Sequence, residues 1–426
     1  MSLFLQRRYT FSSTCSSDAQ SFPSTAETLM SHEELHPFDG LIIETLPADL
    51  QLDFVRQLWA PPGNTPRGGA EKALVTARKH SILSTGGKSD DERIVCERFF
   101  EYYLGQCTHA LRDGGKHVSV RTHRDILELA SLIKDPENTR HDVAHRLCSP
   151  YDDDDTISIS SSCIAPDTLV TLKKPQEDAD AAEEDSVYGS IDLVARLLTM
   201  INFGGLDIGV GPCGRLTWTD GSLSQSCHRY FDKTPTLSMK AIQLEKVFNA
   251  RNLQRFTNMR IEWTDNLADH LRMCEFDKKI CLFHHVAFLE NHKCGILRQD
   301  LIHETLKTID LLFPSSDPKV RLWYEKHRYE HGLDPTAAKH GSLRAEDRLI
   351  DNFYYWKDRI CILKQEFDEG TPQTFRQWWW DRRSGPQWYT FWIAIMVLVL
   401  TIFFGIIQSA EGALQVYKAF HPTESN

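Results

Sequence analysis

The chain has 426 residues, 41% of them hydrophobic and 10% aromatic, with a formal net charge of −11 at pH 7. This composition excludes a wholly disordered chain, because it supplies enough apolar side chains for a core. The negative charge would be repelled by phosphate backbones, so we expect no nucleic-acid partner. The eleven cysteines show no paired spacing, which favours reduced thiols in the cytosol over a disulfide framework.

Composition along the chain predicts a mostly helical α+β protein. Acidic, weakly hydrophobic residues from about Asp152 onward separate two regions of apolar periodicity, because such a segment buries too little surface to fold. The predicted regions are disordered residues 1–36, a helical domain 37–150, an acidic linker 151–188, a mixed α/β cytosolic domain 189–370, a Trp/Arg juxtamembrane segment 371–387, a transmembrane helix 388–410 and a short tail 411–426.

Capping signatures predict the helices of the first domain. Ser89 with Glu92, and Thr122 with Asp125, each precede an apolar-periodic run, as in a capping box. We expect a third, short helix over about 138–147.

The second domain combines helical and strand patterns. A helix is predicted over 191–201, strands over 215–218, 259–263 and 279–283, and later helices over about 298–313 and 343–366.

An apolar run near the C-terminus predicts one transmembrane helix. The stretch from Trp388 to Ile407 carries no charge, and about twenty helical residues span about 30 Å, the thickness of the hydrocarbon core of a bilayer. Aromatic and basic residues at its start are typical of a membrane interface. The predicted interface residues are Trp378, Trp379, Trp380, Arg382, Arg383, Trp388, Tyr389 and Trp392.

The charges on either side of this helix predict its orientation. Arg376, Arg382 and Arg383 precede it and only Lys418 follows, so the positive-inside rule places the N-terminal side in the cytosol. We therefore expect a single-pass, tail-anchored protein whose partner is the lipid bilayer. The tail over 411–426 is not basic, which favours the endoplasmic reticulum or secretory membranes over the mitochondrial outer membrane.

Small residues at successive i+4 positions predict a contact face on the same helix. Gly405, Ser409 and Ala413 would form a ridge that lets two helices approach closely. The pattern indicates a possible homodimer through the transmembrane helix.

A group of polar residues between Asp265 and Cys294 is the candidate for chemistry. Asp265 and Asp269 would share a helix face at i, i+4, and metal ligation or acid-base chemistry is one interpretation. The other is packing and hydrogen bonding, since no pair repeats a known zinc spacing. The pattern assigns no cofactor, catalytic residue or metal ligand set. The group comprises Asp265, Asp269, His270, Cys274, Cys281, His284, His285, His292 and Cys294.

Several segments of the C-terminal half carry a resemblance to a known family. They begin at Phe248 (FNARNLQR), Ile261 (IEWTDNLADHL), Lys279 (KICLFHH), Leu312 (LFP), Arg359 (RICILKQEFDE) and Trp378 (WWWDRR), the last running on through Glu411 (EGALQVYK). Together they resemble a large family of uncharacterised filamentous-fungal proteins with one C-terminal transmembrane helix. The resemblance covers about residues 190–420 and implies the same topology, but no activity, cofactor or catalytic residue.

These patterns support two functional hypotheses. The first is a non-enzymatic protein-binding or scaffolding module at a membrane, with an unidentified protein partner; no GxSxG elbow, P-loop, kinase signature or EF-hand loop is present. The alternative is a membrane-proximal enzyme that uses the cluster between Asp265 and Cys294, with or without a metal.

Overall fold

The structure is a computed structural model of the chain. It describes residues 36–62, 88–112, 114–148, 176–204, 215–237, 242–274, 278–370 and 385–420, with backbone alone at 88–95, 176–183 and 385–388. The chain divides into two compact units, Met1–Pro37 and Phe38–Asn426, and every element described below belongs to the second. The segment predicted to be disordered lies almost entirely outside the described residues.

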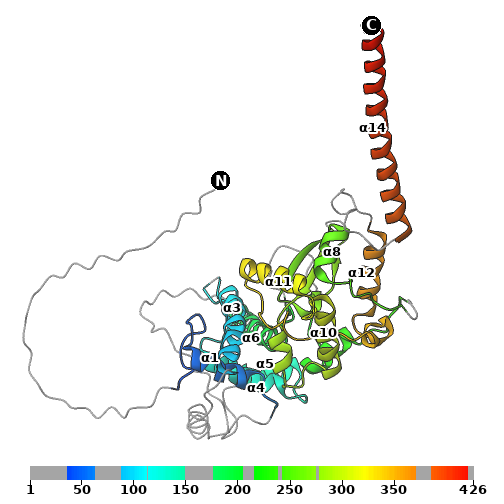
Figure 1. Ribbon diagram of the computed structural model, residues 1–426. Helices are drawn as coiled ribbons and strands as arrows, with labels where there is room; N and C mark the ends of the chain where they lie inside the picture. Colours follow the sequence, from blue (N-terminus) through cyan, green and yellow to red (C-terminus); the bar gives the residue numbers. More distant parts are fainter. Residues whose placement is uncertain are drawn as a thin grey trace, which may run out of the picture. The chain divides into compact units, whose positions relative to one another are not determined.

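The described elements are mostly helices with one small sheet, which confirms the predicted mostly helical α+β class (Figure 1). The helices are α1 (Ala48–Leu58), α3 (Lys88–Ala110), α4 (His123–Lys134), α5 (Arg140–Cys148), α6 (Gln176–Thr199), α7 (Leu223–Phe231), α8 (Ala250–Thr257), α9 (Val286–Asn291), α10 (Gln299–Leu312), α11 (Pro318–His331), α12 (Lys357–Glu369) and α14 (Gly385–Phe420).

The capping box predicted at the start of α4 is present. The Thr122 hydroxyl accepts the N–H of Asp125 at 3.1 Å, and the Asp125 carboxylate accepts the N–H of Thr122 at 2.9 Å. Helix α3 also forms, but it begins at Lys88, one residue before its proposed cap Ser89, and the side chains of Ser89 and Glu92 lie outside the described residues. The third predicted helix is α5, which buries Val143.

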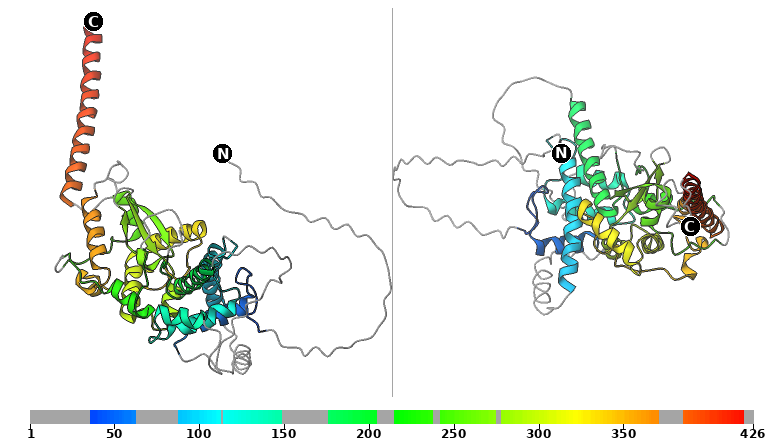
Figure 2. Two further views of the ribbon diagram at one scale, coloured as in Figure 1. Left: turned by 180° about the vertical axis from the view of Figure 1, so that it is seen from behind. Right: turned by 45° about the horizontal axis from the view of Figure 1, so that its top comes forward.

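Helix α6 connects the N-terminal helices to the rest of the unit. It begins at Gln176, earlier than the predicted start at residue 191, and packs against α3, α4 and α5 (Figure 2). Its buried Arg196 donates from Nε to Oε1 of Gln106 at 3.0 Å and from Nη1 to the carbonyl of Phe203 at 2.8 Å. Because α6 begins at Gln176, the end of the predicted acidic linker, residues 176–188, is helical.

Three strands form the sheet, in the order β1-β3-β2. Strands β1 (Arg260–Thr264) and β3 (Lys279–Phe283) are parallel, and β2 (Met273–Cys274) is antiparallel to β3. The predicted strands over 259–263 and 279–283 thus form. The strand predicted over 215–218 was wrong, because there Leu216 makes only an isolated bridge to Phe203.

The two later predicted helices differ in outcome. Helix α10 matches the prediction over 298–313, whereas the helix predicted over 343–366 was too long. Two 3-10 turns, Glu346–Arg348 and Ile350–Asn352, occupy its first half. The carboxylate of Glu304 then accepts the backbone N–H groups of Tyr354 and Trp356, each at 2.8 Å, and α12 begins only after them. At this point the backbone N–H groups of Tyr354 and Trp356 donate to the Glu304 side chain instead of to backbone carbonyls, as they would in a helix.

One continuous cluster of buried apolar residues runs from Phe38 to Phe367. Within it, the Trp59 ring lies 4.6 Å from that of Phe99 and 5.3 Å from that of Phe288. The cluster includes residues of both regions predicted as domains. The proposed linker between them falls largely outside the described residues, so the domain boundaries stay predictions.

Helix α14 is one continuous helix of 36 residues (Figure 1). Its segment Tyr389–Phe420 is long and apolar enough to cross a membrane, and none of its most apolar window is buried within the structure. The helix extends past the predicted end of the span at residue 410, and at 1.5 Å per residue it exceeds the roughly 30 Å of a hydrocarbon core.

Candidate functional site

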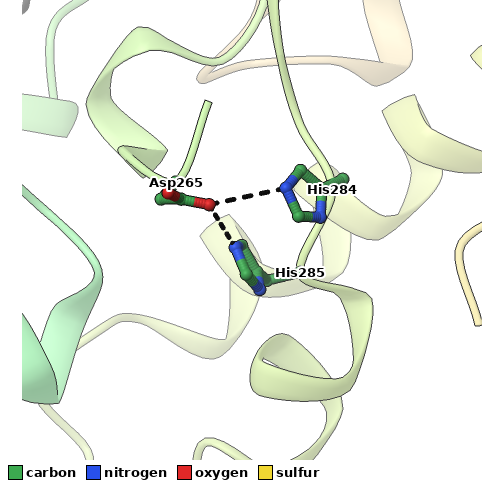
Figure 3. Close-up of side chains that lie close together, drawn as sticks. All are labelled: Asp265, His284 and His285. Carbon is green, nitrogen blue, oxygen red and sulfur yellow. Dashed lines mark hydrogen bonds and ion pairs between the residues drawn. The ribbon is translucent and has the colours of Figure 1, made fainter. Parts of the chain in front are cut away.

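The polar cluster predicted between Asp265 and Cys294 separates into several sites in the fold. Among the described residues, one group of three brings its ligand atoms together: Asp265, His284 and His285 each offer one side-chain oxygen or nitrogen atom, and these three atoms lie within 4.8 Å of one another (Figure 3). This group is the candidate functional site.

Strand pairing brings these three residues together. Thr264 ends β1 and Phe283 ends β3, and these two residues are paired in the parallel register. Asp265 directly follows the first strand and His284 and His285 follow the second, so all three lie beyond the same edge of the sheet. His285 is also the residue that precedes helix α9. Side chains after the carboxyl ends of adjacent parallel strands are a recurrent arrangement for ligand sites.

The two imidazoles converge on one oxygen. Nε2 of His285 lies 2.7 Å from Oδ1 of Asp265, and Nε2 of His284 lies 3.4 Å from the same atom (Figure 3). The imidazole side chains are 5% and 6% exposed, whereas the Asp265 side chain is 55% exposed. The site therefore has a buried wall of two imidazoles and an open side at the carboxylate.

A contact on the far side of His284 sets its tautomer. Its Nδ1 accepts the backbone N–H of Asp334 at 3.3 Å, so in the neutral ring the proton is on Nε2, which faces Asp265. The Asp334 carboxylate accepts the N–H of Ala287 at 2.9 Å and holds the start of α9. Asp334 was not predicted as a site residue.

The pKa values follow from this geometry. Protein atoms around the Asp265 carboxyl group partly desolvate it and so favour its neutral form, but hydrogen bonds from His284 and His285 outweigh that effect and hold the pKa of Asp265 well below its usual range. Burial, with the adjacent His285, lowers the pKa of His284. The site thus favours an ionised Asp265 carboxylate beside a neutral His284 imidazole.

Helix α3 supplies a neighbour that sequence reasoning also missed. The ring of Tyr102 lies 6.2 Å from that of His285, and its hydroxyl donates to the carbonyl of Arg196 at 3.2 Å. Nothing in the local sequence around Tyr102 indicates this contact, since it joins segments far apart in the chain.

The predicted helix face shared by Asp265 and Asp269 was wrong. Leu267–Asp269 is a single 3-10 turn, and the buried Asp269 binds Arg272 at 2.9 Å and Asn266 at 2.7 Å. Its carboxylate serves this local pairing.

The other cluster residues lie apart from the candidate site. His292 and Cys294 form a buried pair with Sγ 3.3 Å from Nε2; burial lowers the pKa of His292 to about 3 and raises that of Cys294. Burial also raises the pKa of Cys281 to about 12, which leaves it a protonated thiol rather than a ready metal ligand. Cys274, on β2, is partly buried.

The membrane-related predictions fall on or beside α14. Trp378, Trp379, Trp380, Arg382 and Arg383 lie outside the described residues, and Trp388 is described only as helical backbone. On α14, Tyr389 is exposed and Trp392 is partly buried.

The predicted helix-contact residues lie on α14. Gly405, Ser409 and Ala413 are exposed at successive i+4 positions. A Cβ atom added at Gly405 would meet nothing within 4 Å, so no other described residue covers the ridge at Gly405.

Comparisons with protein families, with characterised proteins and with solved structures find no match to this chain. The resemblance to filamentous-fungal proteins therefore stays a prediction, and any functional conclusion has to come from the geometry of the chain itself.

Proposed function

We propose that this chain is a single-pass membrane protein in which α14 spans the bilayer, the tail-anchored arrangement predicted from the sequence. The observation that carries the proposal is the apolar segment Tyr389–Phe420, none of whose most apolar window packs against the rest of the described chain. An exposed apolar helix of this length costs free energy in water and is stabilised in lipid. The basic residues before it support a cytosolic position for the globular part, on endoplasmic reticulum or secretory membranes.

Protease protection tests the topology. The full chain, tagged at both ends and inserted into microsomes, is expected to lose its N-terminal tag and to keep a small protected C-terminal fragment. Protection of the large N-terminal part would overturn the proposed orientation.

Alkaline extraction of microsomes tests insertion. The double variant Leu398→Lys with Ile402→Lys should be released from the membrane, because each charge at mid-bilayer costs about 3 kcal/mol. The variant Leu322→Lys, on α11, should not be released.

We further propose that the globular part binds another protein at that membrane. Support comes from α11, where Leu322 and Tyr329 are 73% and 79% exposed and stand seven residues apart, on one helix face. Replacing both with Ser should reduce crosslinking of the chain to neighbouring proteins in microsomes. The control is Tyr354→Ser, which removes an exposed aromatic ring outside α11; equal loss in both variants would count against a binding role for this face.

The enzyme hypothesis has one observation in its favour, the convergence of Asp265, His284 and His285. Turnover of a defined substrate by the full chain in detergent, lost in His285→Ala, would replace the binding role with a catalytic one.

A further inference from the structure

We propose that Asp265, His284 and His285 bind a divalent first-row transition metal ion, with Zn²⁺ as the representative cation. Two imidazoles and one carboxylate are donors that suit Zn²⁺ and its neighbours rather than Mg²⁺ or Ca²⁺, which take oxygen ligands. The inference goes beyond membrane anchoring and does not depend on it.

The spacing of the donor atoms fits such an ion. With metal–nitrogen and metal–oxygen bonds of about 2.0–2.2 Å, two ligands of a tetrahedral site lie about 3.3–3.6 Å apart. The separation between Nε2 of His284 and Oδ1 of Asp265 is 3.4 Å, already within that range. The separation from Nε2 of His285 is 2.7 Å, so binding needs this pair to part by a fraction of an ångström. The exposed Asp265 side chain can supply that movement.

The proposed ligands differ in their surroundings: the two imidazoles are held rigidly, whereas the carboxylate is accessible to solvent. Both imidazoles are buried and fixed at the end of β3, next to helix α9, while the open side at Asp265 gives an ion a path from solvent. With three protein ligands, a fourth position remains for water or another small ligand, as in catalytic rather than structural zinc sites.

One contact has to change on binding. A metal ion on Nε2 of His284 moves the ring proton to Nδ1, which in the structure accepts the N–H of Asp334 across a long 3.3 Å. Asp334 also places a negative charge beside this ring, one that favours added positive charge on His284. We assign the Asp334 carboxylate as the acceptor of the Nδ1 proton, since a carboxylate is a usual partner of a metal-bound imidazole.

Zinc titration of the full chain in detergent, after removal of metal with a chelator, tests the site. Wild type is expected to bind one more Zn²⁺ per chain than His285→Ala or Asp265→Asn, and excess Mg²⁺ should not compete. Asp334→Asn should weaken binding by about 10- to 100-fold, the range for loss of an outer hydrogen-bond partner. His303→Ala, which removes an exposed histidine of α10, should change nothing.

Equal zinc stoichiometry and affinity in wild type, His285→Ala and Asp265→Asn would overturn the proposal. If circular dichroism shows that His285→Ala does not fold, Asp265→Asn decides alone, because that half-exposed side chain lies outside the apolar core. A negative zinc result with normal protease protection would reject the metal site and leave the membrane proposal intact.

Discussion

Nε2 of His270 lies 2.7 Å from Oγ1 of Thr308, and Nδ1 of the same ring accepts the N–H of Phe283 at 3.2 Å. The Thr308 hydroxyl donates to the carbonyl of Thr305, so its oxygen is left to accept the Nε2 proton. Both ring nitrogens are therefore satisfied in a neutral imidazole, which joins β3 to α10 inside the core.

This arrangement predicts a loss of stability in acid. Burial, together with the positive charge of Arg359, lowers the pKa of His270 to about 3. The unfolded chain takes up this proton below about pH 6.5 while the folded chain does not, so stability falls as the pH drops from 6.5 toward 3, by up to about 1.4 kcal/mol per pH unit. His270→Gln should flatten this part of the pH dependence of the thermal midpoint. His303→Gln should keep the wild-type slope, and equal slopes in all three proteins would contradict the prediction.

Glu304 is expected to be important for the junction between α10 and α12. Glu304→Gln leaves one acceptor oxygen for the N–H groups of Tyr354 and Trp356 and turns an amide N–H₂ toward them. We expect a loss of about 1–3 kcal/mol in the free energy of unfolding, the cost of a buried unsatisfied donor. Glu330→Gln, which breaks an exposed 3.9 Å pair with Lys326, should cost less than about 1 kcal/mol in the same denaturant titration.

The same Gly→Ala change should have opposite effects at two positions. A Cβ atom at Gly341 would lie 2.8 Å from Oδ2 of Asp310, whose Oδ1 pairs with Nδ1 of His340 at 2.8 Å. Gly341→Ala should destabilise the protein by about 1–3 kcal/mol through overpacking. At Gly105, exposed within α3, an added Cβ meets nothing within 4 Å, and Gly105→Ala should stabilise by about 0.5–1 kcal/mol.

The cost of Gly341→Ala should also depend on pH. The hydrogen bond to Asp310 raises the pKa of His340, so the pair stabilises the fold fully below about pH 6.5 and loses this contribution as the pH rises further. Thermal unfolding at pH 6 and pH 8 measures this directly: the deficit of the variant should be larger at pH 6, and a larger deficit at pH 8 would be inconsistent with the assigned pairing.

Replacing one small residue of α14 with a large one tests whether the chain self-associates through this helix. Gly405→Leu fills the ridge that continues through Ser409 and Ala413, and should reduce crosslinked dimer in membranes at least about tenfold if two helices meet there. The matched control is Ala410→Leu, which enlarges a residue about 140° around the helix from Gly405. Equal dimer in both variants would exclude this face as the contact.

Local patterns in the sequence were sufficient for several elements. In the capping box, the side chains of Thr122 and Asp125 each accept the backbone N–H of the other residue. This geometry depends only on residues three apart in the sequence, so the sequence pattern was enough to predict it. The strand over residues 279–283 also followed from its composition. The helix predicted over 343–366 was too long because Glu304, which accepts the backbone N–H groups just before α12 begins, lies about fifty residues earlier in the chain.

The sequence predicted the candidate site only as part of a larger group of polar residues between Asp265 and Cys294. Asp265 and His285 are twenty residues apart, and they meet because β1 and β3 are parallel, which the composition of the two strands does not reveal. Asp334 and Tyr102 come from more distant segments still, and tertiary packing alone brings them to the site. Sequence spacing could find the residue types here but could not choose among them.

The contact between Trp59 and Phe288 constrains the order of events during synthesis. The ribosome makes α1 and α3 long before it makes the segment that carries Phe288, so the aromatic face around Trp59 and Phe99 has no partner on that side until translation has passed from residue 99 to residue 288. Exposed apolar surface of this kind is prone to aggregate and is a target for chaperones. Newly made chains that are stalled before residue 288 should therefore be the most dependent on chaperone binding.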